Sequence, residues 1–140
     1  MTRYVVDASV VIKWFVPEVH TDAALRYLDD AHERLAPDLL LPETGNILWK
    51  KVRLGEITEG EGRNILRAVA AAPIQIHPSG PLLDPAFAIA RALDRSVYDS
   101  LYLALAVAHE CRMVTADRRL HNALRNTPLA AHLRWVEDAP

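Results

Sequence analysis

Short apolar runs rich in β-branched residues alternate along this chain with longer segments of helical pattern. The first run, at residues 4–6, leads directly into a helical segment that Pro17 stops, and the run at residues 112–115 repeats this order late in the chain. Strands that alternate with helices form parallel β units joined by right-handed crossovers, with helices on both faces of the sheet. The pattern therefore predicts an α/β fold with a central parallel sheet.

Caps and breakers place the individual elements. Thr58 and Glu61 fit a capping box, Asp84 followed by Pro85 resembles a helix cap, and Pro42 suits the first position of a helix. Strands are expected at residues 4–6, 35–37, 74–77, 112–115 and 133–136, and helices at residues 8–16, 21–34, 42–54, 59–72, 85–93, 97–110 and from Asp117 onward.

Size and composition narrow the class of protein. The 140 residues, 51% of them hydrophobic, suit a single domain spanning residues 1–140. A net charge of −2 argues against a protein that holds long nucleic acids by charge alone. Cys111 is the only cysteine, so neither a disulfide framework nor a thiolate metal cluster is expected, which fits a reducing cytoplasm. The longest apolar run, residues 101–108, is shorter than the roughly 18 residues of a membrane span, so no membrane association is expected.

Four acidic residues lie where an apolar segment ends or a helix begins. Asp7 follows the first strand, Asp117 follows residues 112–115 by two positions, and Glu43 and Asp99 lie in first turns of helices. Ligands bind to parallel sheets beyond the carboxyl ends of the strands, so these side chains are expected to converge there. Converging carboxylates repel one another unless they share protons or hold a hard cation, and Mg²⁺ or Mn²⁺ prefers such oxygen ligands.

Each acid also has a simpler structural interpretation to be weighed. Asp117 is a good helix cap, and Glu43 and Asp99 are favourable charges near helix N-termini. Asp7, at the end of a buried strand, has no capping explanation of equal strength. Ser9 and Thr115 are candidates for hydrogen bonds to the acids or to metal-associated water, although capping and turn bonding explain them equally well.

The acidic positions lie in motifs that resemble those of a known family. The motifs are Val5-Val6-Asp7-Ala8-Ser9, Pro42-Glu43, Tyr98-Asp99-Ser100-Leu101-Tyr102-Leu103-Ala104-Leu105-Ala106 and Val114-Thr115-Ala116-Asp117-Arg118-Arg119-Leu120. In this order they resemble the four acidic motifs of PIN-domain ribonucleases, above all the VapC-type toxins of bacterial toxin–antitoxin pairs.

The resemblance implies a fold, an activity and partners. It implies a three-layer α/β/α PIN-like domain and a Mg²⁺-dependent endoribonuclease, with Mn²⁺ as a substitute ion. Asp7, Glu43, Asp99 and Asp117 would be both the catalytic residues and the metal ligands. The implied partners are an RNA substrate, a cognate antitoxin protein and a second copy of the chain in a homodimer.

Other functions are compatible with parts of the pattern. A phosphoacceptor receiver domain is also a small α/β unit with an acidic Mg²⁺ pocket, but it needs an acidic pair after the first strand and a late lysine. Here the first strand ends Asp7-Ala8, and no lysine follows Lys51. A PIN nuclease that matures RNA outside any toxin system, and a PIN-like binding module without activity, remain open as alternatives.

Overall fold

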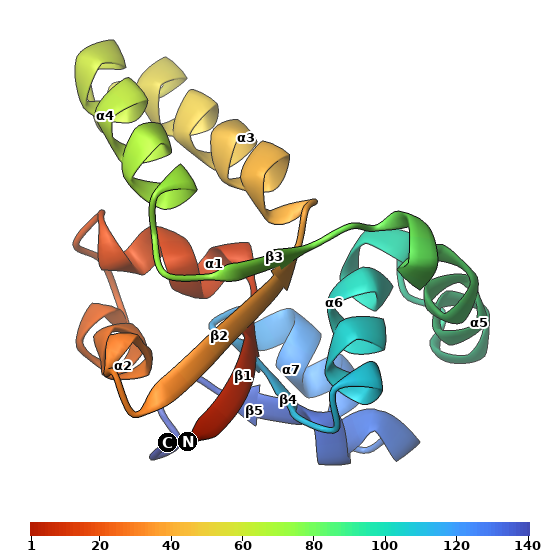
Figure 1. Ribbon diagram of the computed structural model, residues 1–140. Coiled ribbons are helices and arrows are strands. Elements are labelled where there is room, and N and C mark those ends of the chain that lie inside the picture. Colours follow the sequence, from red (N-terminus) through yellow and green to blue (C-terminus); the bar gives the residue numbers. More distant parts are fainter.

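A five-stranded parallel sheet forms the centre of the computed structural model, which describes residues 1–140 (Figure 1). Its strands lie in the order β3-β2-β1-β4-β5, and every neighbouring pair is parallel. The predicted parallel α/β architecture is therefore confirmed. The strands are β1 Thr2–Val6, β2 His32–Pro37, β3 Gln75–His77, β4 Arg112–Thr115 and β5 Leu133–Trp135.

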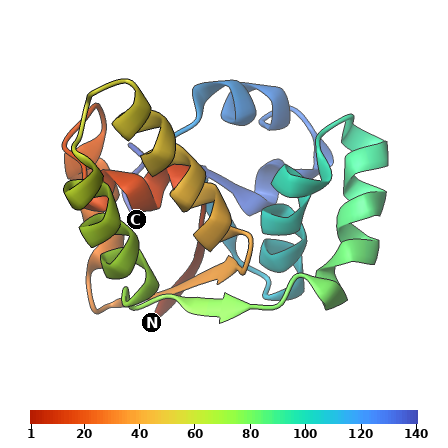
Figure 2. The same ribbon diagram turned by 90° about the horizontal axis from the view of Figure 1, so that it is seen from above.

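Helices cover both faces of this sheet and give three layers, as predicted. Figure 2 shows α1 to α4 on one side and α5 and α6 on the other. No helix has the length and apolar character needed to cross a membrane. The α-helices are α1 Ala8–Val11, α2 Thr21–Leu25, α3 Leu40–Arg53, α4 Glu59–Ala70, α5 Leu83–Leu93, α6 Val97–Ala108 and α7 Arg118–Leu124. Shorter 3₁₀ turns are η1 Ile12–Trp14, η2 Arg26–Leu28, η3 Gly80–Leu82 and η4 Pro128–His132.

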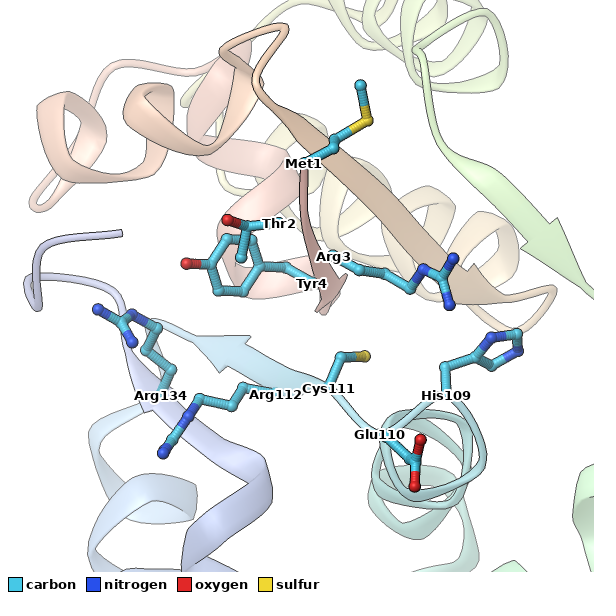
Figure 3. Close-up of a pocket in the computed structure, with 9 residues that line it drawn as sticks. All are labelled: Met1, Thr2, Arg3, Tyr4, His109, Glu110, Cys111, Arg112 and Arg134. Atoms are coloured by element: carbon cyan, nitrogen blue, oxygen red, sulfur yellow. The ribbon is translucent and has the colours of Figure 1, made fainter.

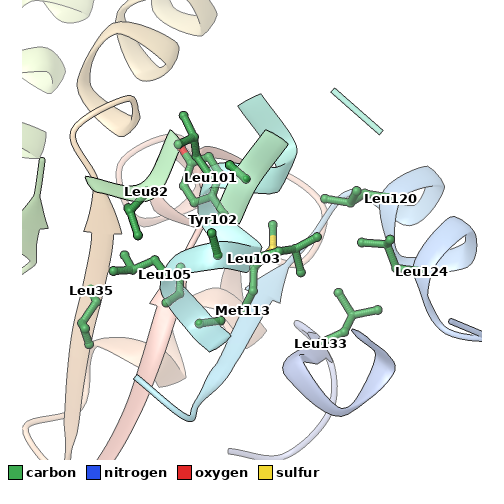
Figure 4. Close-up of a cluster of buried hydrophobic side chains, with 14 residues drawn as sticks. Leu35, Leu82, Leu101, Tyr102, Leu103, Leu105, Met113, Leu120, Leu124 and Leu133 are labelled. Atoms are coloured by element: carbon green, nitrogen blue, oxygen red, sulfur yellow. The ribbon is translucent and has the colours of Figure 1, made fainter. Parts of the chain in front are cut away.

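The largest part of the core lies between the sheet and α6 (Figure 4). Val5, Leu35, Met113 and Leu133 are register partners across four strands, so their side chains form one row on the same face. Residues 101–106 of α6 are all buried against this row and the helices beside it. This position between the sheet and the neighbouring helices explains why α6 is apolar on nearly every face.

The opposite face of the sheet packs on the first four helices. Val114 contacts a cluster that includes Val10 of α1 and Tyr27 of η2, and Val6 contacts a cluster that includes Leu40 of α3. These two clusters fix α1 and α3 against the sheet. Their N-terminal ends, and with them the residues after β1 and at the start of α3, are thereby held at the carboxyl edge.

The prediction of one helix over residues 21–34 is wrong, because the helical segment ends at Leu28 and β2 begins at His32. The Asp29 carboxylate accepts a hydrogen bond from the Ala31 amide at 2.8 Å, which makes a turn. Arg34 then donates to the carbonyls of Tyr27 and Asp29, so an arginine that resembled a helix-surface residue instead holds the helix end against β2.

Two helix starts also differ from the prediction. Helix α3 begins at Leu40, so Pro42 is its third residue, where the missing amide hydrogen still costs no helical bond. Asp84 does not cap α5, because the 3₁₀ turn η3 runs directly into that helix at Leu83. The capping box of Thr58 and Glu61 is present as predicted.

The connection order of the strands creates a crevice at the middle of the sheet. From β1 the chain adds β2 and β3 on one side, and then returns to add β4 and β5 on the other. The helices that follow β1 and β4 therefore lie on opposite faces, which opens a gap at the carboxyl ends of these strands. Asp7 directly follows β1, and Asp117 follows β4 by two residues.

Candidate active site

All four predicted acids line one pocket of about 170 Å³ at this crevice. Asp7 arrives from the end of β1, Glu43 from α3, Asp99 from α6 and Asp117 from the start of α7. The predicted convergence of these side chains is therefore present in the fold. The pocket is lined by Asp7, Ala8, Ser9, Glu43, Ile47, Asp99, Tyr102, Met113, Asp117 and Leu120.

Asp7 is the most buried of the four, with 6% of its surface exposed. Its Oδ1 accepts a hydrogen bond from the Ser9 hydroxyl at 2.5 Å and another from the Val10 amide at 3.1 Å, so Asp7 caps α1. The expectation that Asp7 has no strong capping interpretation is thus wrong. Burial raises the pKa of its carboxyl to about 6, although these donors oppose the rise, and the charge of Glu43 adds to it.

Glu43 is held by a tyrosine that the sequence reasoning did not select. The Tyr102 hydroxyl donates to Glu43 Oε1 at 2.5 Å, from one turn beyond Asp99 on α6. Partial burial raises the pKa of Glu43, the hydrogen bond from Tyr102 lowers it, and the charge of Asp99 raises it. Burial and the neighbouring Glu43 charge raise the pKa of Tyr102, so its phenol stays protonated and donates.

Asp99 and Asp117 are more accessible than Asp7. Asp99 lies in the first turn of α6, which Ser96 caps, and its Oδ2 is 3.5 Å from Nη2 of Arg95. Asp117 caps α7 as predicted, because its Oδ1 accepts hydrogen bonds from the amides of Arg119 and Leu120. Arg95 was also missed, and its position four residues before Asp99 was the available signal.

Each of the four carboxylates has one oxygen held by protein donors, and the second oxygen of Glu43, Asp99 and Asp117 accepts no hydrogen bond. The engaged oxygens are Oδ1 of Asp7, Oε1 of Glu43, Oδ2 of Asp99 and Oδ1 of Asp117. The engaged oxygen fixes the orientation of each side chain, because it bonds to neighbouring protein atoms. The second oxygen of these three acids therefore remains available for a ligand at the pocket that all four acids share, while the Thr115 hydroxyl also contributes to the hydrogen bonding of Asp7.

Ser9 and Thr115 link the two ends of this arrangement. Besides donating to Asp7, the Ser9 hydroxyl accepts from the Ala116 amide at 2.9 Å and lies 3.5 Å from the Thr115 hydroxyl. Thr115 in turn accepts from the Asp117 amide at 3.0 Å. The two hydroxyl groups thus connect the end of β1 with the loop after β4.

Comparison with known proteins identifies the fold family. The model of the family described as the PIN domain matches residues 4–125, most of the chain. The chain belongs to the PIN-domain family. Ribonuclease VapC3 from Pyrobaculum aerophilum is 35% identical to it over 120 residues, which cover 84% of this chain and 92% of the relative.

Solved structures of other proteins share the architecture of this chain. A crystal structure from Pyrobaculum aerophilum has a TM-score of 0.73 at 25% identity, covering 97% of this chain and 85% of the other. The VapBC2 structure from Rickettsia felis, bound to a DNA fragment from its promoter, has a TM-score of 0.65 at 12% identity, covering 96% and 98%. At 12% identity the second likeness concerns the fold alone.

The side chains of this PIN domain suit a hard cation. The pocket offers four carboxylates and no thiolate or imidazole, and the charges of Glu43 and Asp99 already raise the pKa values of their neighbours. No group of three or more His, Cys, Asp or Glu side chains is arranged closely enough to hold a metal ion by itself. Mg²⁺ does not require such a cage, because it keeps several waters and binds proteins through one or two carboxylates.

Proposed function

We propose that this PIN domain, over residues 1–140, is a Mg²⁺-dependent endoribonuclease and the toxin of a toxin–antitoxin pair. The observation that carries the proposal is the set of four acids around one pocket, each held in place through an anchored oxygen. The 35% identity to a relative named a ribonuclease supports RNA as the substrate.

Metal binding follows from the charge of the pocket. An acidic pocket repels a phosphodiester, so the negative potential must be offset before RNA can approach. Asp7 and Asp99 would hold Mg²⁺, or Mn²⁺ in its place, directly, and Glu43 and Asp117 would hold it directly or through water. When bound, the ion supplies positive charge for the developing phosphate charge and lowers the pKa of a water molecule.

The residues of the chain position this pocket and need not attack the phosphate themselves. Ser9 and the Val10 amide orient Asp7, and Tyr102 orients Glu43, so both carboxylates are held in place where they line the shared pocket. The buried wall formed by Met113 and Leu120 limits access of bulk water from the core side. Preorganised oxygens of this kind reduce the reorganisation that substrate binding requires.

An antitoxin is the expected protein partner. The 35% identical relative carries the name VapC, the name of the toxins of toxin–antitoxin pairs that the motifs of this chain resemble, which supports an antitoxin for this chain. A shallow acidic pocket that is open to RNA is also open to a basic side chain. The antitoxin would insert an arginine or lysine near Asp7, Glu43, Asp99 and Asp117 and compete with metal or substrate.

A homodimer is the expected assembly of the chain. Leu83 and Phe87 of α5 are 50% and 61% exposed, and Tyr98 at the start of α6 is 64% exposed. These residues belong to α5 and α6, which pack against each other at one side of the sheet (Figure 2). Exposed apolar groups gathered on one pair of helices favour burial against a second copy. Sedimentation of wild type and Phe87→Asp measures the molar mass of each protein, and a dimeric wild type with a monomeric variant is expected. An unchanged molar mass in Phe87→Asp contradicts a dimer interface on α5 and α6.

One experiment tests the activity. Purified protein is incubated with a mixed RNA pool and with a circular RNA, with Mg²⁺ or with chelator, and the new ends are mapped. Cleavage of both substrates only in the presence of the ion is expected, because a circle has no end for an exonuclease. Intact RNA with both Mg²⁺ and Mn²⁺ would instead favour an inactive binding module, and equal cleavage in chelator would remove the metal from the proposal.

The biological role requires a separate test, because a PIN nuclease of RNA maturation would cleave RNA as well. A small protein encoded in the neighbouring reading frame is co-expressed and purified with the chain. Inhibition of cleavage by that protein is expected for a toxin–antitoxin pair. Tight binding without inhibition, or equal binding after all four acids are neutralised, contradicts the proposed antitoxin contact.

A further inference from the structure

A second and larger pocket, of about 530 Å³, lies at the opposite edge of the sheet, where β1 and β4 begin (Figure 3). Its volume falls within the range of about 300–1,000 Å³ that small-molecule pockets occupy. None of its residues belongs to the acidic pocket. It is lined by Met1, Thr2, Arg3, Tyr4, His109, Glu110, Cys111, Arg112 and Arg134.

The strand register explains why the basic side chains gather here. Tyr4 is the register partner of Arg112, and Val114 is the partner of Arg134. Side chains alternate along a strand, so Tyr4, Arg112 and Arg134 project from the same face of the sheet. The Arg134 guanidinium lies 5.9 Å from the centre of the Tyr4 ring. Figure 3 shows Arg3 extending toward His109 on the other side of the pocket.

Arg112 and Arg134 make few hydrogen bonds with the rest of the protein. The nearby Arg34, which is buried, donates to three backbone carbonyls and is fully explained as a structural residue. In contrast, Arg112 makes one hydrogen bond, to the Leu133 carbonyl, and Arg134 makes one, to the Tyr27 hydroxyl. Neither has a carboxylate within 4 Å. Since a guanidinium has five N–H donors, most of theirs remain free.

The pocket is basic although the chain is slightly acidic, with a net charge of −2. Three arginines and His109 line it, and Glu110 is the one carboxylate among the lining residues. Arg3 is paired with Glu33 at 3.0 Å, so the uncompensated charge comes mainly from Arg112 and Arg134. Two free guanidinium groups on one face of a pocket are suited to an anion with several oxygens.

We propose that this pocket binds the phosphate groups of a nucleotide-sized anion. A guanidinium group can bind two phosphate oxygens through two parallel N–H···O hydrogen bonds. The free donors of Arg112 and Arg134 allow both arginines to contact one ligand. The phosphate is carried either by a free nucleotide or by an RNA backbone, and the two sources share the same chemistry here. The inference does not depend on the ribonuclease proposal, because the acidic pocket supplies none of its residues.

The first test is a calorimetric titration of the full chain with inorganic pyrophosphate at low salt in chelator, which keeps divalent metal out of the acidic pocket. Saturable binding is expected, and Arg112→Gln and Arg134→Gln should each weaken it about tenfold, as expected for the loss of a hydrogen bond to a charged group. Glu110→Gln should tighten binding severalfold. Arg91→Gln, which removes a positive charge from an exposed site on α5, is the matched control and should leave the affinity unchanged.

The arginine variants should lower the affinity and Glu110→Gln should raise it, and a general loss of folding cannot produce both changes. Urea unfolding of each variant checks the fold directly. No saturable binding by wild type, equal weakening by Arg91→Gln, or no change in any pocket variant would overturn the proposal. Amide chemical shifts that change on titration at Thr2–Tyr4 and Arg112 would support it.

A competition experiment assigns the source of the phosphate. Nucleoside diphosphate and a short single-stranded RNA are each added to the pyrophosphate complex in chelator. Displacement by the diphosphate alone assigns a free nucleotide, and displacement by RNA, lost in Arg134→Gln, assigns the RNA backbone. If neither compound displaces pyrophosphate, the proposal that the pocket binds a nucleotide-sized anion is overturned.

Discussion

The two edges of the sheet carry opposite charge, although the same strands run between them. At the carboxyl edge four acids line a pocket of about 170 Å³, whereas at the amino edge three arginines line a pocket of about 530 Å³. Helix direction accounts for the difference. The four acids cap or lie in the first turns of α1, α3, α6 and α7, where the partial positive charge of a helix N-terminus stabilises them.

Helix α6 spans both edges and makes the contrast clear. Its first turn carries Asp99, and its end leads to His109 and Glu110 in the basic pocket. A helix C-terminus has partial negative charge, which favours nearby arginines such as Arg112. The comparison teaches that a parallel α/β sheet supports a cation site at one edge and an anion site at the other with little electrostatic conflict.

The largest expected effect concerns cleavage. Asp7→Asn and Asp99→Asn should each lower Mg²⁺-dependent cleavage of RNA by roughly 10²-fold or more, because an amide is a poorer metal ligand and carries no charge. The amide side chain in Asp7→Asn keeps an Oδ1 that accepts from Ser9 and Val10, so the fold should persist. Initial rates on a labelled RNA, with circular dichroism as the folding check, measure this. Asp30→Asn, which changes an exposed aspartate outside both pockets, is the control, and wild-type rates in both Asp7→Asn and Asp99→Asn would refute the site.

The second effect concerns stability without metal. The pKa of Asp7 is about 6 when folded and 3.8 in its ordinary state, so the folded chain holds more protons between these values. Its buried charge therefore destabilises the fold fully above pH 6, by roughly 2–3 kcal/mol, and this cost disappears as the pH falls toward 4. In chelator, Asp7→Asn should unfold at higher urea than wild type at pH 7.5 and at similar urea near pH 4.

The matched control for that comparison is Asp30→Asn, which changes an exposed aspartate outside both pockets. It should show no stabilisation at either pH. Asp7→Asn that is less stable than wild type at pH 7.5 would mean that capping of α1 outweighs charge crowding.

The parallel fold and the convergence of the acids were predictable from the sequence, but the anchoring of those acids was not. Asp7 and Asp117 follow strands directly, so local pattern was sufficient to place them at one edge. The Tyr102 contact with Glu43 joins residues 59 positions apart on two different helices, and only the tertiary structure determines it. The helix over residues 21–34 was predicted wrongly for the same reason, since residues 32–37 pair with β1 and β3 and Arg34 donates to the Pro73 carbonyl, 39 positions away.

The third effect concerns that tyrosine. Tyr102→Phe removes the hydroxyl that orients Glu43 but keeps the ring in the core. The Mg²⁺ concentration for half-maximal cleavage should rise about tenfold, a typical cost of losing a group that orients a metal ligand, while the rate at saturating Mg²⁺ changes less. Tyr98→Phe, on the exposed side of the same helix, is the control. An unchanged Mg²⁺ requirement in Tyr102→Phe would exclude this orienting role.

The smallest expected effect lies at the basic edge, where Glu110 ends α6 in the left-handed conformation with φ of 51°. The Glu110 amide donates to the Val107 carbonyl and the Cys111 amide to the Ala106 carbonyl, which is the helix ending that usually places glycine at this position. Glu110→Gly removes the side-chain strain but adds freedom to the unfolded chain, so a net stabilisation of about 0.5–1 kcal/mol is expected in urea unfolding. Glu110→Ala removes the carboxylate but keeps Cβ, so it should give little of this gain. If Glu110→Gly and Glu110→Ala were equally stabilised, the destabilisation by Glu110 would be electrostatic, because a carboxylate is unfavourable at a helix C-terminus. The amino edge of the sheet would then disfavour acidic residues despite its arginines.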